Sequence, residues 1–173
     1  MTIHFEHPFL PPEPERDPAR RLRGRVGATV TLWTAGVGAE RVGLTVSSYL
    51  VAAGEPARIV ALLHPESDLL ERLEEEGTAV VALLGWRQRD VADVFAGVRP
   101  APGGPFRGSG WEQTAWGPRL ADVATWAGVR LDAAATHDVG WSRLVEVVVE
   151  HVELGDEDSP LVHRRGRYQR PDA

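Results

Sequence analysis

The fold is decided by Gly43-Leu44-Thr45-Val46-Ser47-Ser48-Tyr49, a run of small and hydroxyl-bearing residues between two apolar segments. Before it, residues 28–34 alternate apolar and hydroxyl side chains, and after it residues 57–63 form a short apolar run; both patterns predict β-strands. We expect a loop over residues 44–48 between them. Its backbone N–H groups and hydroxyls would have little steric cover, so a flat heteroaromatic ring or a phosphate can approach them. An ordinary polar turn is the alternative.

The segments that follow predict short helices among many strands. Residues 67–76 form an amphipathic helix with Ser67 as N-cap and Gly77 as its end, and residues 87–95 form a second short helix. Further strands are expected over residues 78–84, 126–131 and 140–152 and near the C-terminus. High strand content with only short helices indicates an all-β barrel, because closure removes exposed sheet edges.

Composition excludes several classes of chemistry. The 173 residues suit one domain, and the absence of cysteine rules out disulfides, thiolate nucleophiles and Cys-ligated metals. All 19 basic residues are arginine, which excludes Schiff-base lysines and the Walker-A lysine. The six histidines lack ligand spacing, so no metal site is expected. Redox chemistry would therefore need a bound organic cofactor.

Charge and hydropathy restrict the partners. A net charge of −6 argues against general nucleic-acid binding, which needs a basic surface. No apolar run approaches the roughly 20 residues of a membrane span, and the N-terminus has no signal-peptide pattern. We expect a cytoplasmic protein that binds neither membrane nor nucleic acid.

Two segments lack helix or strand periodicity. Residues 1–21 are rich in proline and charge, including Pro18, which leaves little scope for helix, so an extended arm is predicted. Residues 97–118 combine glycine, proline and the aromatics Phe106, Trp111 and Trp116 in what reads as a long loop. Loops of this length are usually functional or packed against another surface.

The order of these segments resembles the flavin reductase-like family with the FMN-binding split barrel. Its members run strand, Gly-Leu/Met-Thr-Ala/Val-Ser-Ser, apolar strand, short helix, and a strand ending in Leu before a Gln-Arg-like helix that finishes in Phe-Ala. The matching parts here are residues 42–49, 59–63, 67–76, 79–84 and 88–96. Residues 160–168, Pro-Leu-Val-His-Arg-Arg-Gly-Arg-Tyr, are similar to the family's terminal Pro-Leu-x-x-x-x-Gly-x-Tyr. The number and order of the motifs carry the resemblance over residues 22–168.

The resemblance implies a Greek-key split barrel over residues 22–168 with short peripheral helices, an arm over 1–21 and a tail over 169–173. It also implies an oxidoreductase that binds FMN, or FAD, and accepts hydride from NADH or NADPH. Relatives of this kind work as homodimers with the flavin at the subunit interface, and some supply a flavin-dependent monooxygenase. The sequence leaves the choice between NADH and NADPH open.

Candidate site residues follow from the same motifs. Backbone N–H groups and hydroxyls of Leu44, Thr45, Val46, Ser47 and Ser48 are expected at the flavin ring and its ribityl phosphate. Arg164 and Arg167 are candidates for the phosphate, since arginine suits bidentate phosphate contact; a solvated basic tail is the alternative. Ser67 would approach the phosphate from a helix N-terminus, with simple capping as the alternative. His163 is the candidate catalytic residue, with a structural role as its alternative.

Two departures from the family pattern define a rival hypothesis. Residues 64–68, His-Pro-Glu-Ser-Asp, replace a basic or hydroxyl-rich segment, and their acids would repel a phosphate. The family's late-strand Gly-Asp-His stands here as Gly140-Trp141-Ser142, with His137 and Asp138 in the preceding turn. A chain without the usual histidine fits a flavin-binding carrier, sensor or accessory subunit that lacks reductase activity.

Overall fold

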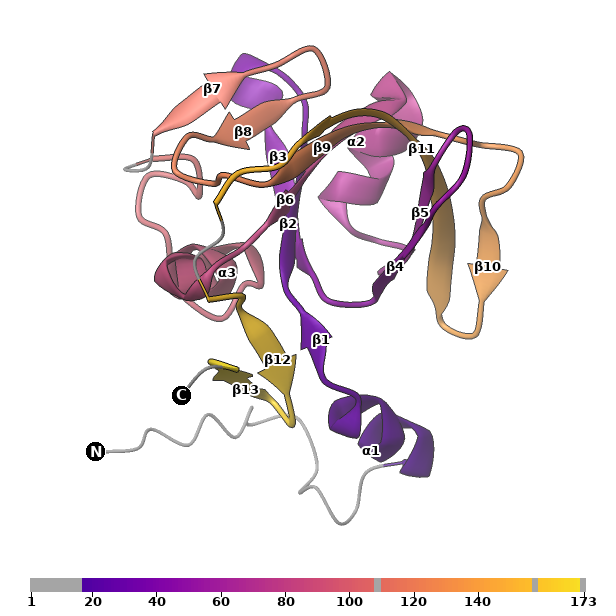
Figure 1. The fold of residues 1–173 in the computed structure, drawn as a ribbon, viewed down its shortest axis with the longest axis vertical. Helices are drawn as coiled ribbons and strands as arrows, with labels where there is room; N and C mark the ends of the chain where they lie inside the picture. The colour runs from indigo at the N-terminus through magenta and orange to yellow at the C-terminus, as the bar shows by residue number, and fades with distance from the viewer. Residues whose placement is uncertain (1–16, 108–109, 157–158, 172–173) are drawn as a thin grey trace.

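The centre of the structure, a computed structural model describing residues 17–107, 110–156 and 159–171, is one strongly curled antiparallel sheet (Figure 1). Its strands follow the order β3-β2-β6-β9-β11-β5-β4, with β10 beside β11. The bounds are β2 Thr31–Ala35, β3 Val42–Val46, β4 Tyr49–Ala52, β5 Arg58–Leu63, β6 Thr78–Leu83, β9 Trp126–Leu131, β10 His137–Val139 and β11 Ser142–Glu153. The first and last strands of the order, β3 and β4, are consecutive in the chain, so the sheet curls into a half-barrel. The predicted all-β barrel is confirmed.

The inside of the curl is the first of two cores. Trp33 is fully buried there among apolar side chains from six strands. Helix α2 (Asp68–Glu76) closes one end by burying Leu69, Leu70 and Leu73. It begins at the predicted N-cap and ends at Gly77, whose φ of 74° is the left-handed conformation that glycine adopts without steric cost.

The second core lies on the outer face of β2 and β6. Helix α3 (Arg89–Phe95), preceded by the 3-10 turn η3 (Trp86–Gln88), packs there beside the hairpin of β7 (Trp111–Gln113) and β8 (Pro118–Leu120). The prediction of an unbroken loop over residues 97–118 is therefore wrong at its C-terminal end. The rings of Phe106 and Trp111 lie 5.1 and 5.7 Å from the ring of Phe95, so this segment packs on its own chain.

The N-terminal part is helical where an extended arm was predicted. Helix α1 spans Pro18–Arg25, and Asp17 caps it by accepting a hydrogen bond from the Arg20 N–H at 3.2 Å. Proline is tolerated in the first turn of a helix because that N–H has no intrahelical partner. The predicted boundary between residues 21 and 22 thus falls inside α1, and residues 1–16 of the arm lie outside the described ranges.

Below the barrel, α1 lies beside a small second sheet (Figure 1). This sheet has the order β1-β12-β13, with bounds β1 Ala28–Thr29, β12 Val162–Arg164 and β13 Arg167–Gln169. The hairpin of β12 and β13 therefore reaches one residue into the predicted tail. Its hydrogen bonds to β1 and α1 join the two ends of the described chain at one pole of the molecule.

The helices are short and peripheral, as the sequence predicts. α1, α2 and α3 have eight, nine and seven residues, and η2 (Gly38–Glu40) is a single turn between β2 and β3. Over the residues that the structure describes, no helix has the length and apolar character needed to cross a membrane.

Candidate functional site

The corner between β3 and β4 is shorter than the sequence predicts. Leu44, Thr45 and Val46 belong to β3 and pair with β2, so the predicted loop over residues 44–48 is wrong for its first three positions. The side chain of Val46 is buried in the barrel core, and that of Leu44 packs against the same core. Only Ser47 and Ser48 remain at the corner, where the chain passes from one end of the sheet to the other.

The hydroxyls of this region have different surroundings. Thr45 Oγ1 donates to the carbonyl of Ala92 in α3 at 2.7 Å, which makes it a tie between β3 and α3. Ser48 Oγ donates to the Leu62 carbonyl at 2.8 Å and holds the corner against β5. Ser47 is half-buried, and its hydroxyl has no hydrogen-bond partner within the described part of the chain. Ser47 is therefore the hydroxyl best able to contact a ligand.

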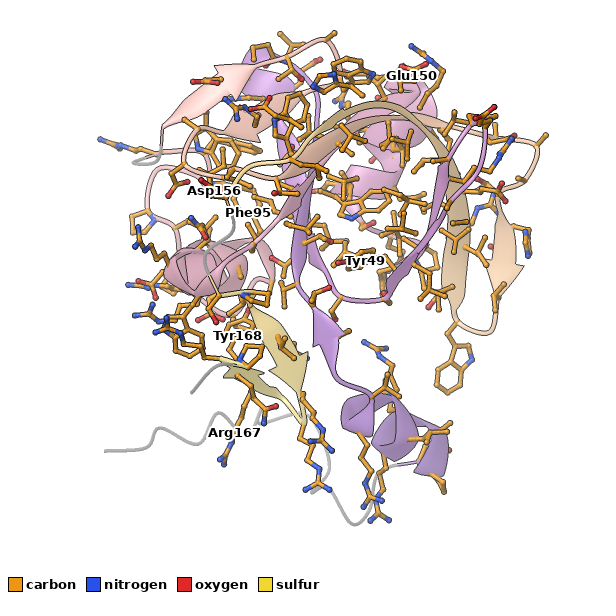
Figure 2. All side chains as sticks on the ribbon, viewed as in Figure 1. Tyr49, Phe95, Glu150, Asp156, Arg167 and Tyr168 are labelled. Atoms are coloured by element: carbon orange, nitrogen blue, oxygen red, sulfur yellow. The ribbon has the colours of Figure 1, made fainter. Side chains whose placement is uncertain are left out.

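A groove of about 690 Å³ opens beside the corner. Its walls are residues 26–29, the corner itself, β4, the outer face of β5, and the side chains of Val139 and Leu144. In Figure 2 Tyr49 lies within the curl of the sheet above β1, and its hydroxyl is 2.5 Å from that of Thr29. The groove has the size and the mainly apolar lining, with a few hydroxyls, of a small-molecule site.

The sequence did not single out Thr29 and Tyr49. Both border the groove together with Ser47 and Ser48. The available signals were the alternation of hydroxyls over residues 28–34 and the position of Tyr49 directly after the two serines. Neither signal indicates that the two hydroxyls meet, because the contact spans 20 positions of the chain.

Two of the predicted arginines belong to the β12–β13 hairpin next to the groove wall, although neither side chain is part of the groove lining. Arg164 and Arg167 are directly opposite each other in the register. Gly27 lines the groove, and a Cβ atom built on Gly27 would lie 3.6 Å from the Cδ atom of Arg164. Arg164 Nε donates to the Arg25 carbonyl at 3.2 Å, which fixes the side chain at this place. An anion at this end of the groove would lie near the Arg164 side chain.

His163 lies on the other face of the same hairpin, because neighbouring residues of a strand point to opposite sides. Its ring centroid is 5.8 Å from that of Tyr168, whose hydroxyl hydrogen-bonds Asp93 of α3. Burial and the Arg23 guanidinium lower the pKa of His163, and Asp93 opposes that shift. Burial and Asp93 raise the pKa of Tyr168 well above its usual range. His163 and Arg164 therefore point to opposite faces of the hairpin.

Ser67 is likewise separate from the groove. Its Oγ accepts the Leu70 N–H at 3.3 Å, as an N-cap does, and it borders a shallow hollow with Glu66, Glu71, Glu74 and Glu75. These carboxylates would repel a phosphate. In the described chain Ser67 therefore acts as the N-cap of α2, which is the alternative to phosphate binding.

The position of the missing family histidine lies beside two residues that line the groove. Ser142 is the first residue of β11 and pairs with Val139, which lines the groove as Leu144 does. His137 and Asp138 are exposed on β10; the carboxylate of Asp138 pairs with Arg143 at 3.0 Å. The neighbouring histidine and aspartate thus form separate surface contacts.

Comparison with known proteins gives a family match over most of the chain. The model of the flavin reductase like domain matches residues 23–172. The reductase component of 4-hydroxyphenylacetate 3-monooxygenase from Thermus thermophilus is 31% identical over 146 residues, which cover 84% of this chain and 90% of the relative. A flavin reductase domain protein from Arthrobacter sp. FB24 has a similar structure, with TM-score 0.78, 24% identity, and coverage of 88% of this chain and 93% of that one. An NADH:FAD oxidoreductase from Streptomyces globisporus has TM-score 0.79 at 22% identity, covering 95% and 98% of the two chains.

Proposed function

We propose that this chain, which belongs to the flavin reductase-like domain family, binds FMN in the groove beside Ser47 and Ser48 and reduces it with NADH or NADPH. The observation that carries the proposal is the coincidence of the family's Thr-Val-Ser-Ser segment with a groove lined by apolar side chains and a half-buried hydroxyl at Ser47.

The residues present fit a flavin. The groove is bordered by Gly27 and by small side chains at the corner, so a planar ring can lie against the main chain. Its apolar walls suit the ring, and the hydroxyls of Ser47, Thr29 and Tyr49 suit its polar edge. Arg164 and Arg167 at one end suit a phosphate, because guanidinium groups bind it bidentately.

The protein's own residues supply binding and orientation. When bound, the flavin supplies the redox chemistry by accepting a hydride from the nicotinamide. Ser47 would fix the ring by hydrogen bonding, and the apolar walls of the groove would exclude water from its face. His163 stays a prediction as a catalytic residue; within one chain it contacts Tyr168 rather than the groove.

A second function, flavin binding without reductase activity, is favoured by one specific observation. Ser142 stands at the groove edge where the family pattern has histidine. A hydroxyl cannot become a cation near neutral pH, so it would lack the charge that imidazole can bring to a nicotinamide or a reduced flavin. Rapid mixing with NADH or NADPH distinguishes the two functions.

We also propose a homodimer that covers the outer face of β4 and β5. Leu50, Leu62 and Val139 are 72%, 39% and 40% exposed on this face. Contiguous exposed apolar side chains usually mark an interface. The aromatic segment around Phe106 and Trp111, which the sequence predicts to be functional or packed against another surface, packs on its own chain. Light scattering should give twice the monomer mass, and Leu50→Glu should give a monomer.

We propose that this chain supplies reduced flavin to a monooxygenase. The Thermus thermophilus relative is the reductase component of such an enzyme. Reduced flavin released by this chain would then be the substrate of a separate oxygenase protein. Hydroxylation of an aromatic compound in a mixture of both proteins with NAD(P)H would support the proposal.

The test of flavin reduction has two stages. Calorimetry with FMN, FAD and riboflavin measures binding, and an FMN preference over riboflavin would indicate a phosphate contact. Anaerobic stopped-flow mixing with NADH or NADPH then follows loss of the flavin absorbance band. Binding without reduction by either nicotinamide would leave the non-catalytic alternative. No saturable binding of any flavin would refute both functions.

A further inference from the structure

One pole of the molecule carries a concentration of arginine that the flavin phosphate does not account for. The C-terminal half of α1 and the tip of the β12–β13 hairpin are joined by a hydrogen bond from the Arg165 N–H to the Gly24 carbonyl at 2.7 Å. Five exposed arginines surround this contact and are called the arginine pole below: Arg23, Arg25, Arg164, Arg165 and Arg167. Figure 2 shows Arg167 at the end of the molecule that carries α1.

Within the described residues, the segments that carry the arginine pole contain few acids. Residues 17–29 and 160–171 contain eight arginines and one acid, Asp17, although the whole chain has a net charge of −6. Within the described residues, Arg58, Arg72, Arg99, Arg119, Arg130 and Arg143 form ion pairs, and none of these six belongs to the pole. Unpaired like charges at close quarters repel one another, so an anionic ligand would relieve this repulsion.

The backbone at the tip of the pole is held in an unfavourable conformation. Arg165 has φ of 52°, and in the described chain it is the one residue other than glycine with a positive φ. The next residue, Gly166, has φ of 74°. Two successive positive φ angles are typical of a hairpin turn that prefers Asn-Gly. An arginine costs about 1 kcal/mol at such a position. Strain of this kind is often found where a side chain has a function.

The arginine pole is continuous with the flavin groove. The side chain of Arg164 lies next to Gly27, which lines the groove. Val26, the residue that follows α1, also lines the groove. In the proposed function the nicotinamide meets the flavin in this groove, and its adenosine half would extend beyond the groove's end. NADPH differs from NADH by a 2′-phosphate on that half, a monoester that carries about −1.5 to −2 charges at neutral pH. Arginine is the side chain that accommodates this group in dinucleotide sites.

We propose that the arginine pole selects NADPH over NADH by binding the 2′-phosphate of its adenosine. This inference rests on the proposed flavin reductase function and names the nicotinamide that it uses. The proposed function already assigns Arg164 and Arg167 to the flavin phosphate, which leaves Arg23, Arg25 and Arg165 for the second anion. The proposal assigns these three residues a role in substrate specificity.

The first experiment uses adenosine fragments and does not depend on activity. The full chain is titrated by calorimetry with adenosine 2′,5′-bisphosphate and with 5′-AMP at low salt. We expect the bisphosphate to bind at least about tenfold more tightly, a difference of about 1.4 kcal/mol. Raising the salt from about 50 to 200 mM should reduce this preference, since the contacts are exposed.

Matched variants locate the effect. Arg23→Gln/Arg25→Gln and Arg165→Gly should bring the two adenosine ligands within about threefold of each other while FMN affinity stays within twofold. Arg107→Gln removes an exposed arginine outside the pole and should leave the preference unchanged. Arg165→Gly also relieves the positive φ, so loss of binding in a variant at least as stable as the parent cannot be a folding defect.

The outcomes separate this inference from the flavin proposal. Equal affinity of the parent for the two adenosine ligands, or a preference that survives in the pole variants, would overturn the inference even if FMN binds and is reduced. If the parent protein did not bind FMN, the proposed flavin function would be refuted instead. A kcat/KM ratio for NADPH over NADH that falls toward one in the pole variants, but not in Arg107→Gln, would support the inference with the reacting substrates.

Discussion

Thr45→Val separates the structural role of Thr45 from the ligand role that its motif suggests. The hydroxyl donates to the Ala92 carbonyl at 2.7 Å, and that carbonyl also accepts the Ala96 N–H at 2.9 Å. Removal of the hydroxyl therefore leaves no backbone group without a partner. Valine keeps the branched shape of threonine, so little packing is lost. The free energy of unfolding should fall by the net value of one hydrogen bond, about 0.5–1.5 kcal/mol.

The assay pairs stability with affinity. For a chain of this length, about 1 kcal/mol lowers Tm by about 2–4 °C, which urea unfolding and thermal melting both resolve. FMN affinity of Thr45→Val should stay within twofold of the parent. Ser47→Ala, the matched variant, should leave Tm nearly unchanged and weaken FMN by the same 0.5–1.5 kcal/mol, roughly a two- to twelvefold loss. A Thr45→Val variant with unchanged stability and at least tenfold weaker FMN binding would refute the assignment.

Three further predictions follow from single contacts. Gly128→Ala should lower the free energy of unfolding, measured in urea, by about 1–3 kcal/mol, because a Cβ at this position would overlap the Trp116 ring. Gly24→Ala is the control: a Cβ there would have open space around it, so this change should be neutral or stabilising. Because the pKa of His163 is lowered in the folded protein, the unfolded chain binds a proton more readily than the folded one does. The resulting contribution to folding stability is complete above about pH 6.5 and is lost as the pH falls toward the folded-state pKa. Tm should therefore fall less between pH 8 and pH 5 in His163→Gln than in the parent. Ser142→His should raise the rate of flavin reduction in stopped flow with unchanged FMN affinity; an unchanged rate would argue that the position does not limit the chemistry.

The parts of the fold that the sequence predicts well are those with local signals. Helix α2 has a capping serine, an apolar face and a terminal glycine within one short segment, and each acts where expected. The strand at residues 58–63 follows from a continuous apolar run. These features depend on neighbours along the chain, so they need no knowledge of the tertiary structure.

The parts that were missed depend on contacts between distant residues. Thr45 reads as a loop hydroxyl because its acceptor, the Ala92 carbonyl, is 47 positions away. The helix at Pro18–Arg25 was missed because proline was taken as a helix breaker, although in the first turn it is compatible with a helix. The segment containing Phe106 and Trp111 reads as an exposed loop until its contacts with Phe95 are known. Tertiary packing decides the first and third of these cases, whereas α1 was missed because a local signal, the first-turn proline, was misinterpreted.

The alternation of side chains along β12 limits which residues of the terminal motif can act together. His163 and Arg164 are adjacent in the sequence, and the family resemblance assigns both to the flavin edge. On a strand they point to opposite faces, and Arg164 Cδ lies 3.6 Å from a Cβ built on Gly27, a residue of the groove wall. His163 then lies with Tyr168 and near Asp93, on the α3 side of the hairpin. Phosphate binding by Arg164 and catalysis by His163 would therefore have to take place on opposite faces of the β12–β13 hairpin.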